Sequence, residues 1–166
     1  MQVTLVDADP GWPATYELLR RRIVGALGER IVTIAHVGST SVPGLSAKPV
    51  IDIVVEIDDA ADEPRYLPAV QLVGFELRRR EPDWYEHRVF RLDDPASNLH
   101  VFGVGCDEVA RMLRFRDRLR VDAADRDRYE QVKRELAAQD WSTVQHYADA
   151  KSDVVTAILA RADERR

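Results

Sequence analysis

The sequence predicts a single α/β (α+β) domain spanning residues 1–166, and three observations favour that fold class. Segments with helical spacing of apolar residues alternate with short apolar runs typical of strands. A chain of 166 residues, 45% hydrophobic and 32% charged, is large enough for one core and too short for two ordinary domains. The last third of the chain is helical in texture throughout, so we expect a C-terminal helical segment.

The first half of the chain predicts a helix, two strands and a short helix. A turn at residues 10–13 leads into a helix with apolar residues at Leu18, Leu19, Ile23 and Leu27, which ends at Gly28. Residues 31–37 and 50–57 are apolar and rich in β-branched side chains, as buried strands are. Residues 67–72 favour a short helix before Gly74.

The second half predicts three further strands and then helices. The strand candidates are 75–79, 85–92 and 99–104, and the turn signals between them indicate antiparallel neighbours. From residue 107 onward apolar stripes predict two or three helices, with Asp122 and Ser142 as N-caps. The charge-dense run 111–134 mixes both signs and favours a solvated helix face.

Composition excludes several classes of protein. The formal net charge of −5 provides no global positive field, so nucleic acid is not an expected partner. The single Cys106 cannot form an intramolecular disulfide and is typical of an inert buried thiol. The N-terminus lacks the basic and apolar regions of a signal peptide, and apolar runs such as 51–55 are too short to span a membrane. We therefore expect a cytoplasmic protein without a membrane anchor.

The loop at residues 36–49 is the first candidate site, because it is longer than the connection that two adjacent strands require. Gly38 allows close approach of the backbone to a ligand, and the amides and hydroxyls of Ser39 and Thr40 can donate to phosphate oxygens. Lys48 adds a positive charge at the end of the same loop. The alternative is an ordinary Gly/Pro-rich connection, for which a Gly-Ser pair is common.

Asp52 strengthens the prediction, because it places a charge inside a strand that is otherwise built for burial. A carboxylate there needs a cation or hydrogen-bond donors. It could be the catalytic acid and could bind Mg²⁺ beside a triphosphate. The alternative is a buried ion pair with Lys48 or an arginine.

The segment HVGSTSVPGLSAKPVIDI at 36–53 closely resembles the signature of the GrpB family. The similarity extends to HRVF at 87–90, NLHVF at 98–102, FRDRLR at 115–120 and YADAKS at 147–152. The resemblance implies a nucleotidyltransferase-like core, a small mixed sheet packed by helices with a Gly-Ser loop after its first core strand. Related domains also occur fused to dephospho-CoA kinase.

The chain departs from the pattern of active nucleotidyltransferases, which carry two carboxylates at i and i+2 on one strand. Asp52 is followed at i+2 by Val54 and preceded at i−2 by Val50. Glu56 shares the strand face of Asp52 but lies about 13 Å away, too far to share a metal ion. Where the resemblance implies a third acid on the 99–104 strand, this sequence has His100. A two-metal mechanism is therefore not expected.

Three other residues complete the predicted site. His100 is a candidate catalytic residue, as a general base, a phosphate donor or a metal ligand. Arg88 and Arg91 lie on opposite faces of their strand, and the family match favours Arg88 as the inward-facing ligand contact. Lys151, on the last helix, is expected to reach the same cleft, with a solvated surface position as the alternative.

Two main hypotheses follow. The first is a nucleotide-dependent transferase or ligase acting on a small metabolite, with Mg²⁺ and a nucleoside triphosphate. Ser39, Thr40 and Lys48 would hold the phosphates, and His100 or Arg88 would orient the acceptor or the leaving phosphate. The second is a non-catalytic nucleotide- or metabolite-binding accessory domain that has lost the second carboxylate. A purely structural role for the motif is a third possibility, and either a monomer or a homodimer is expected.

Overall fold

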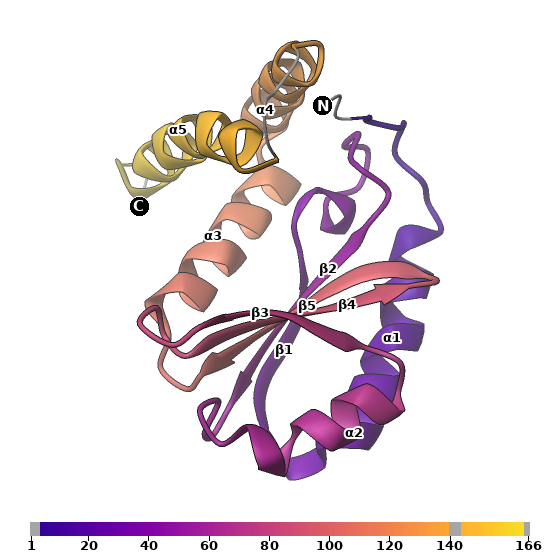
Figure 1. The fold of residues 1–166 in the computed structure, drawn as a ribbon. Helices are drawn as coiled ribbons and strands as arrows, with labels where there is room; N and C mark the ends of the chain where they lie inside the picture. The colour runs from indigo at the N-terminus through magenta and orange to yellow at the C-terminus, as the bar shows by residue number, and fades with distance from the viewer. Residues whose placement is uncertain (1–3, 140–143, 165–166) are drawn as a thin grey trace.

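The chain folds around one five-stranded mixed sheet, seen in a computed structural model that describes residues 4–139 and 144–164 (Figure 1). The strands are β1 (Ile31–Val37), β2 (Ile51–Ile57), β3 (Glu76–Glu81), β4 (His87–Asp93) and β5 (Ala96–Gly103). Their order in the sheet is β1-β2-β5-β4-β3. The β2–β5 pair is parallel and the other pairs are antiparallel. The predicted α/β fold with a mixed sheet is confirmed.

The described residues form five α-helices: α1 (Trp12–Leu27), α2 (Leu67–Leu72), α3 (Asp107–Val121), α4 (Ala123–Ala137) and α5 (Val144–Glu164). Short 3₁₀ turns occupy Gly28–Arg30, Ser39–Ser41 and Glu63–Arg65. Figure 1 shows α1 and α2 on one face of the sheet, α3 on the other, and α4 and α5 beyond the end of α3. All the predicted helices and strands are therefore present, with boundaries shifted by a few residues.

Strand alternation divides β2 between the two faces of the sheet. Ile51, Ile53, Val55 and Ile57 are at most 2% exposed and pack in the main core under α1 and α2. Asp52 and Val54 point to the opposite face, where Val54 packs with Phe102 and with Val109 of α3. The face of the sheet under α1 and α2 is apolar. The face toward α3 combines a smaller apolar core with a strip of polar side chains.

A third cluster attaches the β1–β2 loop to the C-terminal helices. Val42 and Leu45 of the loop, Leu119 of α3, Tyr129 of α4 and Ile158 of α5 are buried together. Burial of apolar area stabilises this arrangement by about 25 cal/mol per Å². The loop is thus held between the sheet and α4, and this contact positions the site.

Capping and periodicity explain the helices. Asp122 caps α4 as predicted, because its carboxylate accepts a hydrogen bond of 2.9 Å from the Asp125 amide. The other predicted cap, Ser142, lies outside the described residues. In α1, Leu19, Ile23 and Leu27 are in the core, whereas Leu18 is 48% exposed. The 111–134 run is not a uniformly solvated face, since Asp125 and Lys133 are buried.

Candidate functional site

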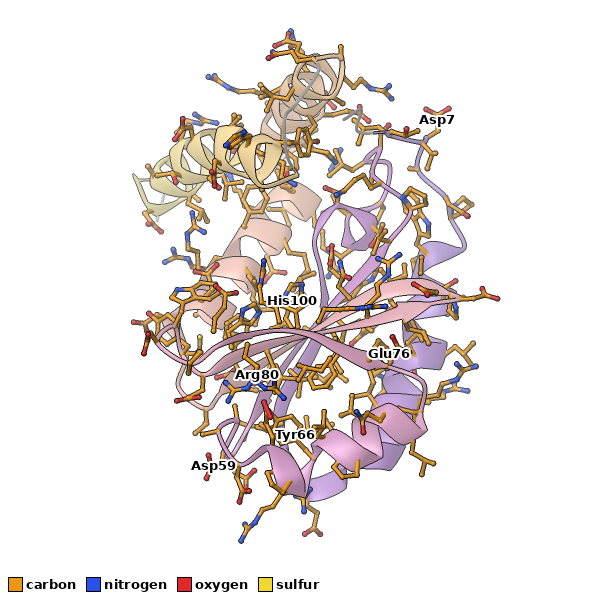
Figure 2. All side chains as sticks on the ribbon, viewed as in Figure 1. Asp7, Asp59, Tyr66, Glu76, Arg80 and His100 are labelled. Carbon is orange, nitrogen blue, oxygen red and sulfur yellow. The ribbon has the colours of Figure 1, made fainter. Side chains whose placement is uncertain are left out.

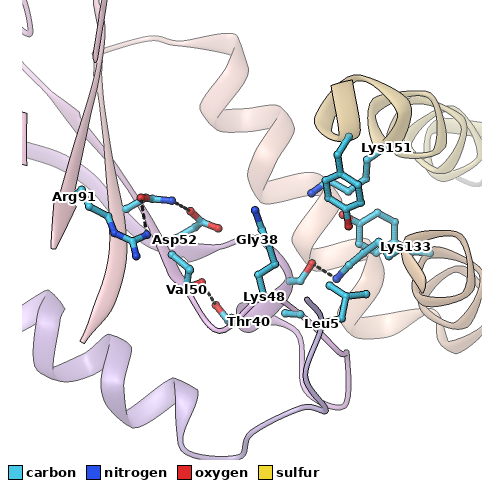
Figure 3. Close-up of a pocket in the computed structure, with 14 residues that line it drawn as sticks. Leu5, Gly38, Thr40, Lys48, Val50, Asp52, Arg91, Lys133 and Lys151 are labelled. Carbon is cyan, nitrogen blue, oxygen red and sulfur yellow. Dashed lines mark hydrogen bonds between the residues drawn. The ribbon is translucent and has the colours of Figure 1, made fainter. Parts of the chain in front are cut away.

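A pocket of about 170 Å³ lies between the sheet and the C-terminal helices (Figure 3). Its walls come from the β1–β2 loop, the strands β2, β4 and β5, and the helices α4 and α5. Six of the predicted site residues line it: Gly38, Ser39, Thr40, Lys48, Asp52 and Lys151. The tertiary structure therefore brings together most of the candidates that the sequence indicated.

Gly38 meets Asp52 directly. The glycine has φ 73°, in the left-handed region that disfavours other residues. A Cβ atom added there would lie 2.8 Å from Asp52 Oδ2, closer than real contacts allow. The sequence indicated that Gly38 permits close approach to a ligand, and the structure shows that it permits close approach to Asp52.

Asp52 is surrounded by hydrogen-bond donors and not by a paired arginine. Asn98 donates to its Oδ1 atom over 3.3 Å, and the His100 ring nitrogen Nε2 lies 3.5 Å from the same oxygen. Burial raises the pKa of Asp52, but the contacts with His100 and Asn98 outweigh burial and hold it below its ordinary value. The predicted alternative, an ion pair with Lys48 or an arginine, is not the arrangement found.

A row of polar side chains crosses the sheet next to Asp52. Asp52 stands beside Asn98 in the parallel β2–β5 register, and Asn98 stands beside Arg91 in the antiparallel β4–β5 register. Arg91 Nη1 donates to Asn98 Oδ1 over 3.4 Å. Arg91 therefore lines the pocket, one strand further from Asp52.

Arg88 lies on the other face of the sheet, and the prediction that it faces the pocket is wrong. Its side chain is 7% exposed and donates to Glu63 over 2.9 Å and to Glu86 over 3.0 Å. In register it stands beside Val101, which belongs to the main core. Both arginines are tied into the fold, and local sequence alone did not decide which of the two reaches the pocket.

The hydroxyl of Thr40 is already used within the fold. It lies 2.8 Å from His36 Nε2 and within 3.5 Å of the Val50 carbonyl. His36 in turn stacks on Tyr16 of α1, with ring centroids 4.7 Å apart. Burial, with Arg120 nearby, lowers the pKa of His36 to about 4 and keeps the ring neutral. Thr40 thus shapes the loop as well as lining the pocket.

His100 lies behind Asp52 and does not line this pocket itself. Its Nδ1 atom is 3.1 Å from His87 Nε2, and His87 Nδ1 is 2.8 Å from Glu81. Figure 2 shows His100 on the side of the sheet toward α3, with Tyr66 and Arg80 on the side toward α2. The structure thus supports a role for His100 in positioning Asp52.

Glu56 is occupied elsewhere, as the spacing predicted. Its carboxylate accepts hydrogen bonds from the Gly105 and Cys106 amides, over 3.0 and 3.3 Å, just before α3. Cys106 itself is a buried thiol, as expected, and burial raises its pKa. Within residues 4–139 and 144–164, no group of three or more His, Cys, Asp or Glu side chains could hold a metal ion.

Lys133 of α4 is a site residue that sequence reasoning missed. It lines the pocket, is 2% exposed, and its ammonium nitrogen Nζ donates to Ser39 Oγ over 2.7 Å and to the Ser46 carbonyl over 2.6 Å. Nζ also lies 5.2 Å from the centre of the Tyr129 ring. No local signal distinguished this lysine from its charged neighbours on the helix.

The pocket is cationic. Lys48, Arg91, Lys133 and Lys151 line it together with one carboxylate, that of Asp52. The side chain of Lys48 is exposed at the mouth of the pocket, but partial desolvation there and the nearby Lys151 lower its pKa. Lys151 lies over the Tyr147 ring, 5.3 Å from its centre, and the neighbouring Tyr129 raises its pKa. Such an excess of positive charge suits an anionic ligand.

Fold and site together define an α/β protein with a cationic pocket at the end of a mixed sheet. A family model described as GrpB protein matches residues 2–161. The chain therefore belongs to the GrpB family, as the motifs indicated.

Individual relatives agree with this assignment. A UPF0157 protein of Halalkalibacterium halodurans is 53% identical over 161 residues, which are 97% of this chain and 83% of that protein. A dephospho-CoA kinase of Mycolicibacterium paratuberculosis is 32% identical over 158 residues, but the match covers only 39% of the kinase. A crystal structure of conserved protein GrpB from Enterococcus faecalis matches with a TM-score of 0.81 at 24% identity, covering 96% of this chain and 99% of that one.

The sequence predicted no membrane anchor, and the hydropathy of the helices bears on that prediction. In the parts of the chain that the structure describes, none of the helices carries a stretch long and apolar enough to cross a bilayer.

Proposed function

We propose that this GrpB-family protein binds a nucleotide by its phosphates, in the pocket between the sheet and the C-terminal helices. The observation that carries the proposal is the convergence of Lys48, Arg91, Lys133 and Lys151 from four separate segments on one pocket. Charge-assisted hydrogen bonds to phosphate oxygens are about twice as strong as neutral ones. The 3₁₀ turn after Gly38 adds the Ser39 hydroxyl to this set.

The size of the pocket supports binding through the phosphates. At about 170 Å³ it is smaller than the roughly 300 Å³ at which drug-sized ligand pockets begin. A phosphate chain fits such a volume, whereas a complete nucleoside triphosphate exceeds it. The nucleoside would therefore lie outside the pocket, where exposed Lys48 marks its mouth.

The oxygen ligands in the pocket suit Mg²⁺ only when the ion is also bound by a triphosphate. Mg²⁺ is usually held by one or two carboxylates together with substrate phosphates, and Asp52 is the one carboxylate among the residues that line the pocket. Val54 replaces the second acid and is fully buried. Asp52 would thus give the ion one protein ligand, and the ion would neutralise phosphate charge.

Two functions remain open at this pocket. The first is nucleotide-dependent transfer to a small metabolite, with Asp52 oriented by His100 and Asn98. The similarity to part of a dephospho-CoA kinase agrees with a role linked to nucleotides. The second is a non-catalytic accessory domain, which is favoured by the valines at both positions where a second metal-binding acid could stand.

The binding proposal is tested by calorimetric titration with inorganic triphosphate and with each nucleoside triphosphate. Inorganic triphosphate alone should bind, because the proposed contacts are with the phosphates. Arg91→Met should weaken binding about 10-fold, since a charged hydrogen bond contributes about 1.5 kcal/mol. Arg21→Met, which removes an exposed charge from α1, is the matched control. Absence of binding at millimolar triphosphate would exclude this function.

Asp52→Asn separates the two functions. If Asp52 holds Mg²⁺ for catalysis, the variant should bind triphosphate equally with and without Mg²⁺ and lose all turnover. If the wild-type protein already binds equally well in both conditions and shows no turnover, the accessory-domain function is favoured.

A further inference from the structure

Ser39 and Lys133 form a hydroxyl–amine pair at the wall of the pocket. The two side chains come from segments 94 residues apart, and Ser39 Oγ lies 2.7 Å from Lys133 Nζ. Ser39 begins a 3₁₀ turn immediately after Gly38, and both Ser39 and Lys133 line the pocket. A serine within hydrogen-bond reach of a base is the geometry of an activated nucleophile.

The surroundings of Lys133 favour its neutral amine. Burial lowers the pKa of Lys133 to about 7, helped by the positive charges of Lys151, Lys48 and Arg134 and opposed by Glu130. Its two hydrogen-bond partners are uncharged oxygens. At neutral pH a large fraction of the chains therefore carries an unprotonated amine at this position.

The Ser46 carbonyl orients that amine. Nζ donates to this carbonyl over 2.6 Å, which uses one N–H group. The carbonyl is held in turn, because the Ser46 amide donates to Glu130 over 2.9 Å and Arg134 donates to the Ser46 hydroxyl over 2.6 Å. In the neutral amine the lone pair is then free to accept the proton of Ser39. This is the arrangement of serine–lysine catalytic pairs.

We propose that Ser39 is a nucleophile and Lys133 its general base, so that the pocket transfers a phosphoryl group through a covalent phosphoserine. The proposal rests on the proposed function, because Lys48, Arg91 and Lys151 are the groups that would hold the phosphate being attacked. It supplies a chemistry that does not need the second carboxylate missing beside Asp52.

The step balances without an additional oxidant or metal ion. Ser39 Oγ forms a bond to phosphorus while its proton moves to Lys133 Nζ, and the bond between phosphorus and the leaving oxygen breaks. The leaving oxygen takes the proton from the Lys133 ammonium. Water or an acceptor hydroxyl then attacks the phosphoserine and gives its proton to the Lys133 amine. The bond between phosphorus and Ser39 Oγ breaks, and the Ser39 oxygen takes the proton from the Lys133 ammonium, which regenerates both side chains. Positive charge from the three remaining cations stabilises the charge that develops on the phosphoryl oxygens.

The neighbouring Ser41 provides an internal comparison. It lies in the same turn, but its hydroxyl donates to the Gly38 carbonyl over 2.5 Å and it lines a different hollow, beside Tyr16 and Arg120. No amine lies within hydrogen-bond distance of Ser41 among the contacts of the described residues. Of the two serines in this turn, the proposal therefore makes Ser39 the nucleophile and Ser41 an unreactive hydroxyl.

The test is labelling of the full chain with diisopropyl fluorophosphate, followed by intact-mass spectrometry and peptide mapping. One adduct on Ser39 is expected, with a labelling rate that rises with pH around a midpoint near 7. Ser39→Ala should abolish this adduct, and Lys133→Met should lower the labelling rate at least about 100-fold, the lower end of the contribution of a general base. Ser41→Ala is the matched control and should label like the wild type.

The Lys133→Arg variant tests whether Lys133 acts as a base or only contributes a positive charge. Arginine keeps the positive charge at this position but stays protonated, so it cannot accept the Ser39 proton and labelling should be lost. Folding of each variant is checked by circular dichroism, and the wild-type pH profile tests the proposal even if a variant does not fold. An unlabelled wild-type protein at pH 8, or equal labelling of Ser39 and Ser41, would overturn the proposal.

The probe is neutral, so the two proposals can fail separately. Triphosphate binding without labelling would overturn the nucleophile and leave phosphate binding intact. Labelling without triphosphate binding would support the nucleophile and overturn the proposed function.

Discussion

Arg88 and Lys133 are cationic side chains buried in two different regions, one beneath the sheet and one in the pocket at its end, and their partners differ. Beneath α1 and α2, Arg88 is ion-paired with Glu63 and Glu86, and Glu63 is also bound by Arg80. In the pocket at the α4 side, the hydrogen-bond acceptors of Lys133 among the described residues are a hydroxyl and a carbonyl. Carboxylates neutralise the charge of Arg88, whereas the uncharged partners of Lys133 favour its neutral amine.

This difference separates a structural charge from a functional one. The pKa of Glu63 is lowered, chiefly by its hydrogen bond with Arg80, so the ion pair stays charged over the working pH range. Burial lowers the pKa of Lys133 to about 7, so the charge of its side chain depends on pH near neutrality. A titratable group that burial and neighbouring charges perturb strongly, and that lines a pocket, marks a candidate functional site.

The largest effect is expected from Arg88→Met. Removing Arg88 deletes its buried hydrogen bonds with Glu63 and Glu86 and leaves Arg80 as the partner of Glu63, and we expect a loss of about 3 kcal/mol in the free energy of unfolding, measured by urea denaturation. Triphosphate affinity should stay unchanged, since Arg88 faces away from the pocket.

The matched control is Arg80→Met. Arg80 binds the same Glu63 but its side chain is 54% exposed, so the loss should stay below about 1 kcal/mol. If Arg88→Met weakened triphosphate binding in a protein of unchanged stability, the contrast between the two regions would be wrong.

A smaller effect is expected on the free energy of unfolding, which should depend on pH because of Lys133. Its pKa is about 7 in the folded protein and 10.5 in the reference state, so the unfolded chain binds more protons between these values. The free energy of unfolding should therefore rise with pH in this window, by at most about 1.4 kcal/mol per pH unit from this one group. Lys133→Met should reduce that slope, as measured by urea denaturation from pH 7 to about pH 9.

Two points make this measurement specific. Tyr66, whose pKa burial raises to about 12, would lower stability only at higher pH, above the window used. Arg134→Met removes a neighbouring cation of α4 whose side chain is 52% exposed, and should leave most of the slope in place. An unchanged slope in Lys133→Met would show that the lysine stays protonated in the folded protein.

The smallest effect is expected from Lys48→Met. Lys48 lines the pocket but is exposed, so its contact with a phosphate should contribute about 0.6 kcal/mol, a roughly 3-fold change in affinity. Raising the salt concentration should reduce this difference further. Calorimetry on Lys48→Met and Arg91→Met gives the comparison, because Arg91→Met should weaken binding about 10-fold, about 1.5 kcal/mol. Equal losses would mean that exposure does not distinguish the two side chains.

Local sequence predicted the loop and strand well, for physical reasons. An unusually long connection between two apolar strands, with Gly38, Ser39 and a charge inside β2, is costly unless it serves a site. Gly38, Ser39, Asp52 and Lys48 do line one pocket. His100 was predicted beside them and contacts Asp52 from behind.

The errors arose where side-chain direction depended on partners distant in the sequence. Strand alternation showed that Arg88 and Arg91 face opposite ways, but which face carries the pocket is decided by where α1, α2 and the C-terminal helices pack. Lys133 looked like other charges of a surface helix. It is buried because α4 packs against the β1–β2 loop through Tyr129 and Leu45.

The helices and strands, the Gly38 loop and the position of Asp52 could be predicted from the chain alone, because they depend on residue spacing within single segments, and the family followed from its motifs. The entry of Arg91, and not Arg88, into the pocket and the 2.7 Å distance from Lys133 Nζ to Ser39 Oγ could not be predicted in this way. Such contacts join residues from separate helices and strands, and their energies depend on burial and on neighbouring charges that exist only once the chain has folded.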